Sequence, residues 1–291
     1  MSPRVKPIGR LGLLTWKDTL PWQRDNDFIL TSYRHASYSY LKSLASLFAI
    51  HNESANIWSH LLGAIFFAQV LYRYFEMGVN SGETKTQDII ALSVYNFSVT
   101  ACFILSTIFH TFSDHSQEMH KFGNELDHLG IVLVMWGTGI SGTYFAFYCD
   151  GFLRNTYFAI LSSTALGCGI FTLRPEFRKP AYRTTRFLMY CFLGASLFAP
   201  VVHGLFRFGR EELEHAMELW SFLGLALINF TGAAVYAMRI PERWFPGTFD
   251  LLGQSHNWMH VLVLTGAVVR LEGLLTVTAR WQLYGLCPGT S

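Results

Sequence analysis

Apolar residues in this chain of 291 amino acids gather into long continuous runs separated by short polar linkers. A helix that crosses a bilayer needs about 20 mostly apolar residues. Continuous runs predict helices, because the strands of a membrane barrel alternate apolar and polar positions instead. Seven runs meet this length, at residues 57–76, 89–112, 126–149, 152–173, 187–206, 217–238 and 256–277. The pattern therefore predicts an all-α membrane protein with seven transmembrane helices.

The chain divides into three predicted parts. Residues 1–50 form an N-terminal segment, residues 51–278 the seven-helix membrane domain, and residues 279–291 a short tail. A helix over residues 38–48 has an apolar face made of Tyr40, Leu41, Leu44 and Phe48. Such a face predicts a short interfacial helix that lies on the membrane before the first span.

Proline and glycine modify the spans. Pro200 lies inside the fifth run and predicts a kink, because proline cannot donate a backbone hydrogen bond. Glycines let helix backbones approach closely in membranes. The positions expected to pack in this way are Gly137, Gly139, Gly142, Gly167 and Gly169.

Composition strengthens the membrane interpretation and excludes other classes. Charged residues make up only 14% of the chain and hydrophobic residues 51%, whereas an ordinary soluble domain carries about 25% charged residues. The mean hydropathy is +0.27. These values exclude a disordered chain, a coiled coil and a soluble nucleic-acid-binding protein. The net charge of +2 is too small to indicate a polyanionic partner.

The distribution of Lys and Arg predicts the orientation. Near the ends of the spans, these residues number nine on the face of the N-terminus and four on the opposite face. Adding Arg73 and Arg154 to the opposite face narrows this difference without reversing it. Because cytosolic loops carry the excess of positive charge, we expect a cytosolic N-terminus and a non-cytosolic tail.

The cysteines add little to this picture. Cys102, Cys149, Cys168, Cys191 and Cys287 show no CxxC pair and no regular spacing, and four of them lie in apolar runs. The sequence therefore favours neither a disulfide framework nor a thiolate zinc site.

Ionisable residues at the span ends are the candidates for function, because they are costly near a membrane. His256 and His260 begin the seventh run, His110 ends the second, and Asp127 begins the third. With seven spans, these ends all lie on one face of the membrane, which the charge distribution makes cytosolic. Segments far apart in the sequence are therefore expected to meet in one layer of the bundle.

These residues predict a zinc site. His256 and His260 are four residues apart and project from one helical face, so both can bind one ion, and His110 completes a three-histidine set. Three protein ligands leave a fourth position for water, whose pKa zinc lowers to about 7. Residues 257–259 supply no base between the histidines, so Asp127 is the nearest candidate base.

Other interpretations of these residues remain open at this stage. A single histidine at a membrane interface is usually a hydrogen-bonded polar residue, and Asp127 alone could complement a helix dipole. His115, His120 and His128 are rival ligands. The residues Glu53, Asn56 and His60 share a helical face and are interpreted as supporting polar residues.

At these clusters the sequence resembles the progestin and adipoQ receptor family, which includes adiponectin receptors, fungal relatives and haemolysin III-like proteins. The matching motifs are Glu53-x-x-Asn56-x-x-x-His60, Ser106-x-x-x-His110 followed by Asp127, and His256-x-x-x-His260. Arg239-Ile-Pro-Glu-Arg-Trp-Phe-Pro-Gly247 matches as well. The likeness covers roughly residues 24–278 and is greatest to the adiponectin-receptor and fungal branch.

The resemblance implies a seven-helix receptor-like fold with a cytosolic N-terminus. It also implies a zinc ion (Zn2+) held by His110, His256 and His260, with Asp127 near its water. Ser106 matches the serine of the motif, with a role in orienting a ligand or substrate. Family members resemble alkaline ceramidases at this site, which implies ceramide hydrolysis and a ceramide or sphingoid-like ligand drawn from the membrane lipids.

Two functions follow as hypotheses for this multi-pass membrane protein. The first is a zinc-dependent lipid amide hydrolase of the ceramidase type. The second is a non-catalytic receptor or regulator of lipid and zinc homeostasis, in which a structural zinc braces the bundle. A transporter is disfavoured, because the ionisable residues gather at one face and no inverted repeat is visible. No protein ligand is indicated, because the chain lacks a long segment outside the membrane domain.

Overall fold

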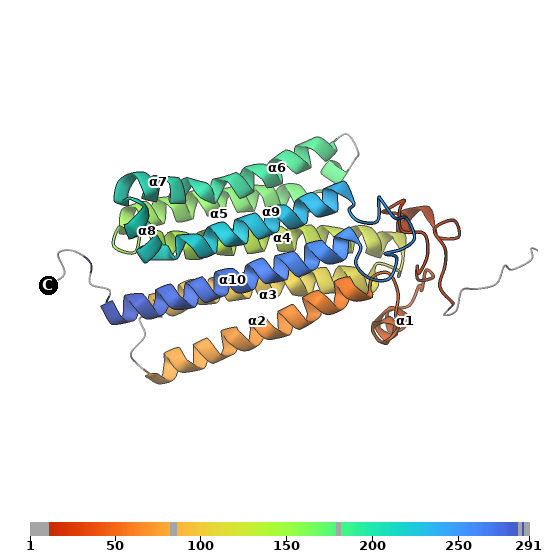
Figure 1. The fold of residues 1–291 in the computed structure, drawn as a ribbon, viewed down its shortest axis with the longest axis horizontal. Coiled ribbons are helices and arrows are strands. Elements are labelled where there is room, and N and C mark those ends of the chain that lie inside the picture. The colour runs from red at the N-terminus through yellow and green to blue at the C-terminus, as the bar shows by residue number, and fades with distance from the viewer. Residues whose placement is uncertain (1–11, 82–85, 179–181, 285–286, 288–291) are drawn as a thin grey trace, which may run out of the picture.

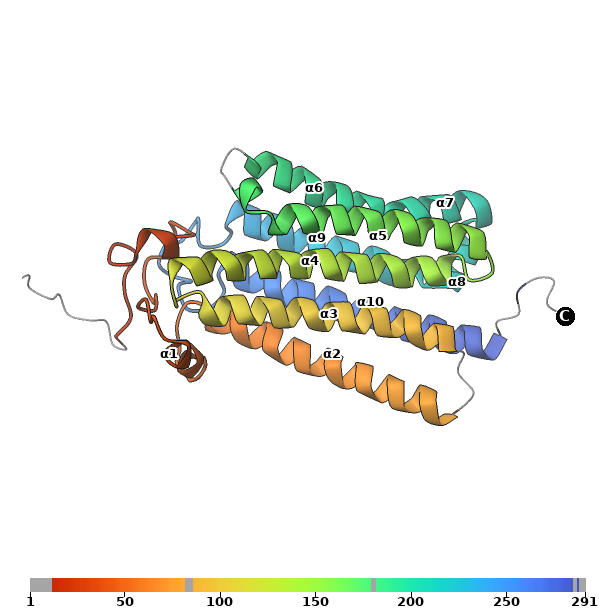
Figure 2. The same cartoon turned by 180° about the vertical axis from the view of Figure 1, so that it is seen from behind.

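The computed structural model describes residues 12–81, 86–178, 182–284 and 287. Seven of its helical segments are long and apolar enough to cross a membrane, and they lie side by side along the long axis of the molecule (Figures 1 and 2). The predicted seven-span α-helical membrane protein is therefore confirmed. The spans are formed by α2 (Ser54–Ser81), α3 (Thr86–Phe112), α4 (Gln117–Ala146), α5 (Gly151–Leu173), α6 (Arg183–Ser196) with α7 (Phe198–Phe208), α9 (Leu219–Met238) and α10 (Ser255–Tyr284).

The core of the bundle lies around α3 and α4, which are its two most buried spans. Phe67, Tyr95, Phe103 and Phe145 are fully enclosed there. Large apolar side chains on the outer helices are exposed instead, as lipid-facing positions require. Examples are Leu62, Phe66, Leu166, Leu227 and Phe230.

One of the predicted glycine contacts shows how closely α3 and α4 approach. A methyl group added at Gly137 would lie 2.3 Å from the Ser98 hydroxyl oxygen, so no larger residue fits there without movement. The same prediction is wrong for Gly167, where such a group would meet nothing within 4 Å. Gly167 therefore faces outward from the bundle, and its place in an apolar run gave no sign of that.

The fifth span is broken, as Pro200 predicts. α6 ends at Ser196 and α7 begins at Phe198, because Pro200 has no N–H to donate to the carbonyl of Ser196. The next element is the short helix α8 (Arg210–Met217). From the sequence this segment was expected to be a polar linker. Its buried side chains are Leu213 and Met217, four residues apart on one face.

The N-terminal segment packs against the membrane domain at one end of the bundle (Figure 1). It contains η1 (Pro21–Gln23), α1 (Tyr40–Ala45) and η2 (Ser46–Phe48), and Ser39 caps α1 by accepting from the N–H of Lys42. The predicted short helix is confirmed. The side chains of Leu41 and Phe48 are 78% and 87% exposed, which suits an apolar face meant for a membrane surface.

A disulfide bond joins Cys149 and Cys287 at the opposite end of the bundle. The expectation that the cysteines form no disulfide is therefore wrong. The two residues are 138 positions apart, and their Cα atoms lie 5.4 Å from each other. Spacing in the sequence could not reveal this pair, because the end of α4 comes beside the end of α10 only after the chain has crossed an even number of spans between them.

Candidate metal centre

Three histidines converge at the end of the bundle where the N-terminal segment packs. His110 lies in the last turn of α3, and His256 and His260 lie in the first two turns of α10. One ligating nitrogen from each ring lies within 4.8 Å of the others. His110 and His260 are buried and His256 is half-buried. The predicted meeting of the second and seventh spans is therefore present in the fold.

The start of α10 is fixed by groups from two other segments. The Glu242 carboxylate accepts from the backbone N–H and the hydroxyl of Ser255, and it also accepts from the side-chain amide of Asn26 at 3.0 Å. A carboxylate at this place satisfies a free N–H of the first turn and complements the helix dipole. These contacts therefore hold the first turn of α10, which carries His256, in its helical conformation.

Glu53 orients His110. The Nδ1 atom of His110 lies 2.7 Å from the Glu53 carboxylate, which also accepts from the side-chain amide of Asn56 at 2.8 Å. Burial raises the pKa of Glu53, but the hydrogen bonds from His110 and Asn56 and the nearby histidine charges outweigh it, so its pKa lies below the ordinary range. An ionised Glu53 fixes the proton of His110 on Nδ1 and directs Nε2 into the cluster.

His260 is oriented in a similar way from α2. Its Nδ1 atom lies 3.2 Å from the backbone carbonyl oxygen of Asn56, and the Asn56 side chain accepts from Asn257 at 2.8 Å. Asn56 thus contacts Glu53, which orients His110, and the first two turns of α10, which carry His256 and His260. This agrees with the interpretation of Glu53 and Asn56 as supporting residues.

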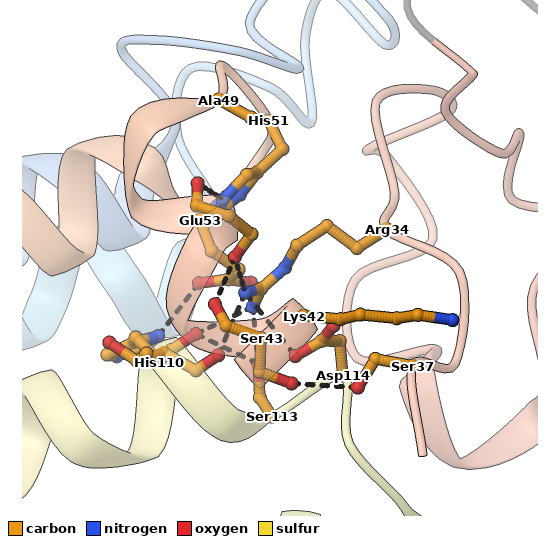
Figure 3. A network of polar contacts seen from close by, with 12 residues as sticks. Arg34, Ser37, Lys42, Ser43, Ala49, His51, Glu53, His110, Ser113 and Asp114 are labelled. Atoms are coloured by element: carbon orange, nitrogen blue, oxygen red, sulfur yellow. Dashed lines mark hydrogen bonds and ion pairs between the residues drawn. The ribbon is translucent and has the colours of Figure 1, made fainter. Parts of the chain in front are cut away.

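The side chain of Arg34, from the N-terminal segment, points toward the end of α3 that carries His110 (Figure 3). Its guanidinium donates to the backbone carbonyls of His110 at 2.6 Å and Thr111 at 2.9 Å, and to the hydroxyl of Ser113 at 3.0 Å. It also lies 3.4 Å from Asp114. The carbonyls at a helix end have no partners within the helix, so Arg34 satisfies the end of α3 that carries the metal ligand.

Asp127 and Ser106 lie near the cluster without belonging to it. Asp127 is half-buried on α4, and none of the described residues donates a hydrogen bond to it or pairs with its charge. That charge nevertheless acts on His256 and on the hydroxyl of Tyr236. Ser106 is 1% exposed, one turn before His110, and its hydroxyl has no partner among the described residues.

The rival histidines take other roles. The ring of His115 stacks on Tyr40 with centroids 4.1 Å apart, and Nδ1 of His120 lies 3.1 Å from the carbonyl oxygen of Ser113. His128 contacts the carbonyl oxygen of Asn124 one turn earlier in its own helix. Within the described residues, the metal-competent group comprises only His110, His256 and His260.

The cluster suits a divalent transition metal. Three imidazoles on two helices match the donor set of catalytic zinc sites, which leave one position open. The Nε2 atom of His110 is buried and has no hydrogen-bond partner among the described residues. This atom is therefore available to bind a metal ion. Sequence reasoning missed Arg34, Asn257 and Glu242, because their roles depend on contacts between distant segments that no local spacing reveals.

Comparison with known proteins identifies the family. The model of the haemolysin-III related family matches residues 48–271. The chain belongs to this family. The sequence is 35% identical over 265 residues to the "ADIPOR-like receptor IZH2" of Saccharomyces cerevisiae, covering 90% of this chain and 83% of the yeast protein. It is 33% identical to the "Adiponectin receptor protein" of Drosophila melanogaster, covering 94% of this chain and 61% of that protein.

A mammalian relative completes the comparison. The "Progestin and adipoQ receptor family member 3" of Mus musculus is 29% identical over 271 residues, which cover 90% of this chain and 84% of the mouse protein. The resemblance to the progestin and adipoQ receptor family, stated above from the histidine motifs, is therefore confirmed. The matched region of the haemolysin-III related family includes the end of α3 and the start of α10, and with them every residue of the candidate metal centre except Arg34.

Proposed function

We propose that this protein holds a zinc ion with His110, His256 and His260 and hydrolyses an amide lipid of the ceramide class. The observation that carries the proposal is the three-histidine cluster, whose ligating nitrogens lie within 4.8 Å of one another. The contacts of Nδ1 with Glu53 and Asn56 support it, because partners of this kind set the tautomer of metal-binding histidines.

The surrounding residues have chemical roles that suit amide hydrolysis. A zinc ion bound here would polarise a carbonyl and acidify water. As water adds to the carbonyl carbon, the Asp127 carboxylate takes a proton from it, and the same proton passes to the nitrogen as the C–N bond breaks. Ser106 offers a hydroxyl to the polar group of the lipid. The products are a fatty acid and a sphingoid base.

A non-catalytic receptor or regulator of lipid and zinc homeostasis is the second candidate. One observation favours it: the cluster joins the ends of α3 and α10, so a metal there would brace the bundle even without turnover. Several similar proteins are also named as receptors. In this case Asp127 would serve only to complement the charge of the metal centre.

We also propose that the metal centre faces the cytosol. The Lys and Arg bias places the N-terminus there. The disulfide of Cys149 and Cys287 supports the same orientation independently, because it lies at the other end of the bundle and disulfides persist in oxidising compartments outside the cytosol.

Metal analysis of the purified protein, combined with fatty-acid release from labelled ceramide, tests the proposal. The hydrolase requires about one zinc per chain and release that a chelator abolishes. Zinc without release from any ceramide would favour the receptor. A protein that binds no zinc would contradict both candidates.

A further inference from the structure

His60 is enclosed by aromatic rings on the membrane side of the metal centre. It lies on α2, and its ring stacks on His260 with centroids 3.8 Å apart and on Phe103 with centroids 4.6 Å apart. The residue is 5% exposed. Its neighbours in space therefore come from α3 and α10, the two helices that carry the metal ligands.

Neither nitrogen of His60 has a hydrogen-bond partner among the described residues. Other buried histidines of the same end differ: Nδ1 of His110 contacts Glu53, and Nδ1 of His260 contacts Asn56. A buried polar group without a partner loses its hydration and gains nothing in return, so it lowers the stability of the fold. Such a group needs an explanation other than packing.

Ser106 is also a buried polar residue without a hydrogen-bond partner in the described part of the chain, and it lies at a depth in the bundle similar to that of His60. Its hydroxyl is buried without a partner among the described residues, and it lies one helical turn deeper in α3 than His110. His260 lies one turn deeper in α10 than His256, and the ring of His60 stacks on it. Three helices thus present His60, Ser106 and His260 at a second level, about 6 Å deeper in the bundle than the outer level of the cluster.

We propose that His60 and Ser106 form a polar subsite that binds the hydroxyl and amide groups at the head of a neutral lipid. The rings in contact with His60 belong to Phe103 and His260, and none of the described residues forms an ion pair with His60 or Ser106. A neutral imidazole and a hydroxyl each offer one donor and one acceptor, which suits uncharged polar groups rather than a carboxylate or phosphate. This inference rests on the proposed function, because it names the part of the site that recognises the amide-lipid substrate.

A packing role for His60 makes a different prediction. If the ring only supports His260 by stacking, phenylalanine should serve equally well, and lipid binding should not change. If the nitrogens bind the lipid, phenylalanine removes a costly buried polar group and the ligand contact at the same time. The variant His60→Phe is then at least as stable as the wild type but binds the lipid poorly, the trade-off expected of a functional residue.

The test measures the melting temperature of the detergent-solubilised protein with and without an N-acyl sphingoid base. A ligand that binds the folded state raises the melting temperature. For His60→Phe we expect a melting temperature equal to or above that of the wild type, unchanged zinc content, and lipid binding weakened at least tenfold. Ser106→Ala should show the same pattern and serves as the second variant if His60→Phe does not fold.

His203→Phe is the matched control. Nδ1 of His203 is hydrogen-bonded to the hydroxyl of Tyr157 on another helix at 2.9 Å. Removing this bonded imidazole should lower the melting temperature, because Tyr157 loses its partner. The response to the lipid should match that of the wild type, because His203 lies in α7, outside the cluster.

The outcomes separate this inference from the proposed function. If the N-acyl sphingoid base stabilises the wild-type protein but no fatty acid is released, the hydrolase proposal is refuted and the proposed subsite is supported. The subsite is refuted if His60→Phe or Ser106→Ala responds to the lipid as the wild type does, or if His60→Phe loses stability and zinc. The subsite is also refuted if a free fatty acid of equal chain length stabilises the wild type more than the N-acyl sphingoid base does.

Discussion

Two histidines of the metal centre, His110 and His260, differ from His115 and His120 in what holds their rings. In His110 and His260, the Nδ1 atom contacts a protein oxygen, from Glu53 and from the Asn56 backbone respectively. The opposite nitrogen of each ring is thereby directed into the cluster. His115 and His120 are instead held by contacts outside it. This contrast predicts which histidines matter for the metal.

Replacing the helix histidines should remove the metal. His256→Ala and His260→Ala are each expected to lose most bound zinc and to lower the melting temperature, because two ligands cannot hold the ion or couple α3 to α10. Metal analysis and thermal unfolding of the purified variants measure both effects. His115→Ala and His120→Ala should keep zinc near the wild-type level. Loss of zinc in these two, with retention in the helix variants, would show that the ligands are assigned wrongly.

His51 should make stability depend on pH. Burial lowers the pKa of His51 to about 4, and Arg34 adds to this lowering by its positive charge. The neutral ring accepts from the N–H of Glu53 and contacts the carbonyl oxygen of Ser46. Between pH 6.5 and 4 the unfolded chain binds the proton more readily, so acid should reduce stability by up to about 3 kcal/mol.

The variant His51→Gln provides the comparison. It cannot take up this proton, so its stability should fall less steeply than that of the wild type as the pH drops from 6.5 to 4. Unfolding by denaturant at several pH values in this range measures the difference. Identical slopes for the two proteins would contradict the assignment of this pH dependence to His51.

The spacing of residues within one helix predicted much of the site, and contacts between helices did not follow from it. The interval of four between His256 and His260, together with span parity, was sufficient to bring both to His110. Ser106 and Asp127 were expected near the cluster. Ser106 lies one turn before His110 on α3, and neither residue belongs to the ligand set found among the described residues. The contact of Glu53 with His110 could not be foreseen, because span parity gives the membrane face on which residues lie but not which side chains touch.

At the scale of elements, the N-terminal segment supports the metal centre. Figure 3 shows Arg34 directed toward the end of α3, where it binds carbonyls that the helix leaves unpaired. The hydroxyl of Thr31 and the backbone N–H of Leu30 donate to Asp250, in the loop that leads to α10. One segment therefore holds the elements that carry His110 and His256.

Removing the Arg34 guanidinium should loosen this support. Arg34→Met keeps much of the side-chain length but leaves Asp114 and two helix carbonyls without their partner. We expect a loss of about 3 kcal/mol in stability and a 10- to 100-fold weaker zinc affinity. Competition with a chelator measures the affinity, and thermal unfolding measures the stability.

Arg24→Met is the control for this experiment. Arg24 is exposed in the same segment, where it donates to the backbone carbonyls of Lys17 and Thr19 and lies over the ring of Trp16. Its replacement should change neither zinc affinity nor stability by a comparable amount. Equal effects of the two substitutions would mean that Arg34 acts as a general surface charge rather than as a support of α3.

At the scale of the whole molecule, the two ends of the bundle differ in chemistry. One end holds the histidine cluster and the N-terminal segment, and the other holds the disulfide of Cys149 and Cys287. Hydrophobic run length was sufficient to predict the spans, and Pro200 was sufficient to predict the break in the fifth. α8 could not be predicted in this way, because a helix of eight residues with a polar surface resembles a linker.

The orientation can be tested directly with tags at the two ends of the chain. A tag at Met1 should be accessible only from the cytosol, and a tag after Ser291 only from the other side, because seven crossings separate them. Protease protection in sealed vesicles measures this accessibility. Both tags on one side would contradict the odd number of spans, and the reverse orientation would place the metal centre away from the cytosol.

The central claim is that this site hydrolyses an amide lipid, and Asp127 gives the most direct measurement. Asp127→Asn keeps size and polarity but cannot accept a proton from water. Zinc content and fatty-acid release from labelled ceramide are measured together for the wild type and this variant. The account predicts equal zinc in both and release typically about 100- to 10,000-fold slower in Asp127→Asn. A zinc-loaded wild type that releases no fatty acid, or a variant that releases it at the wild-type rate, would contradict the account.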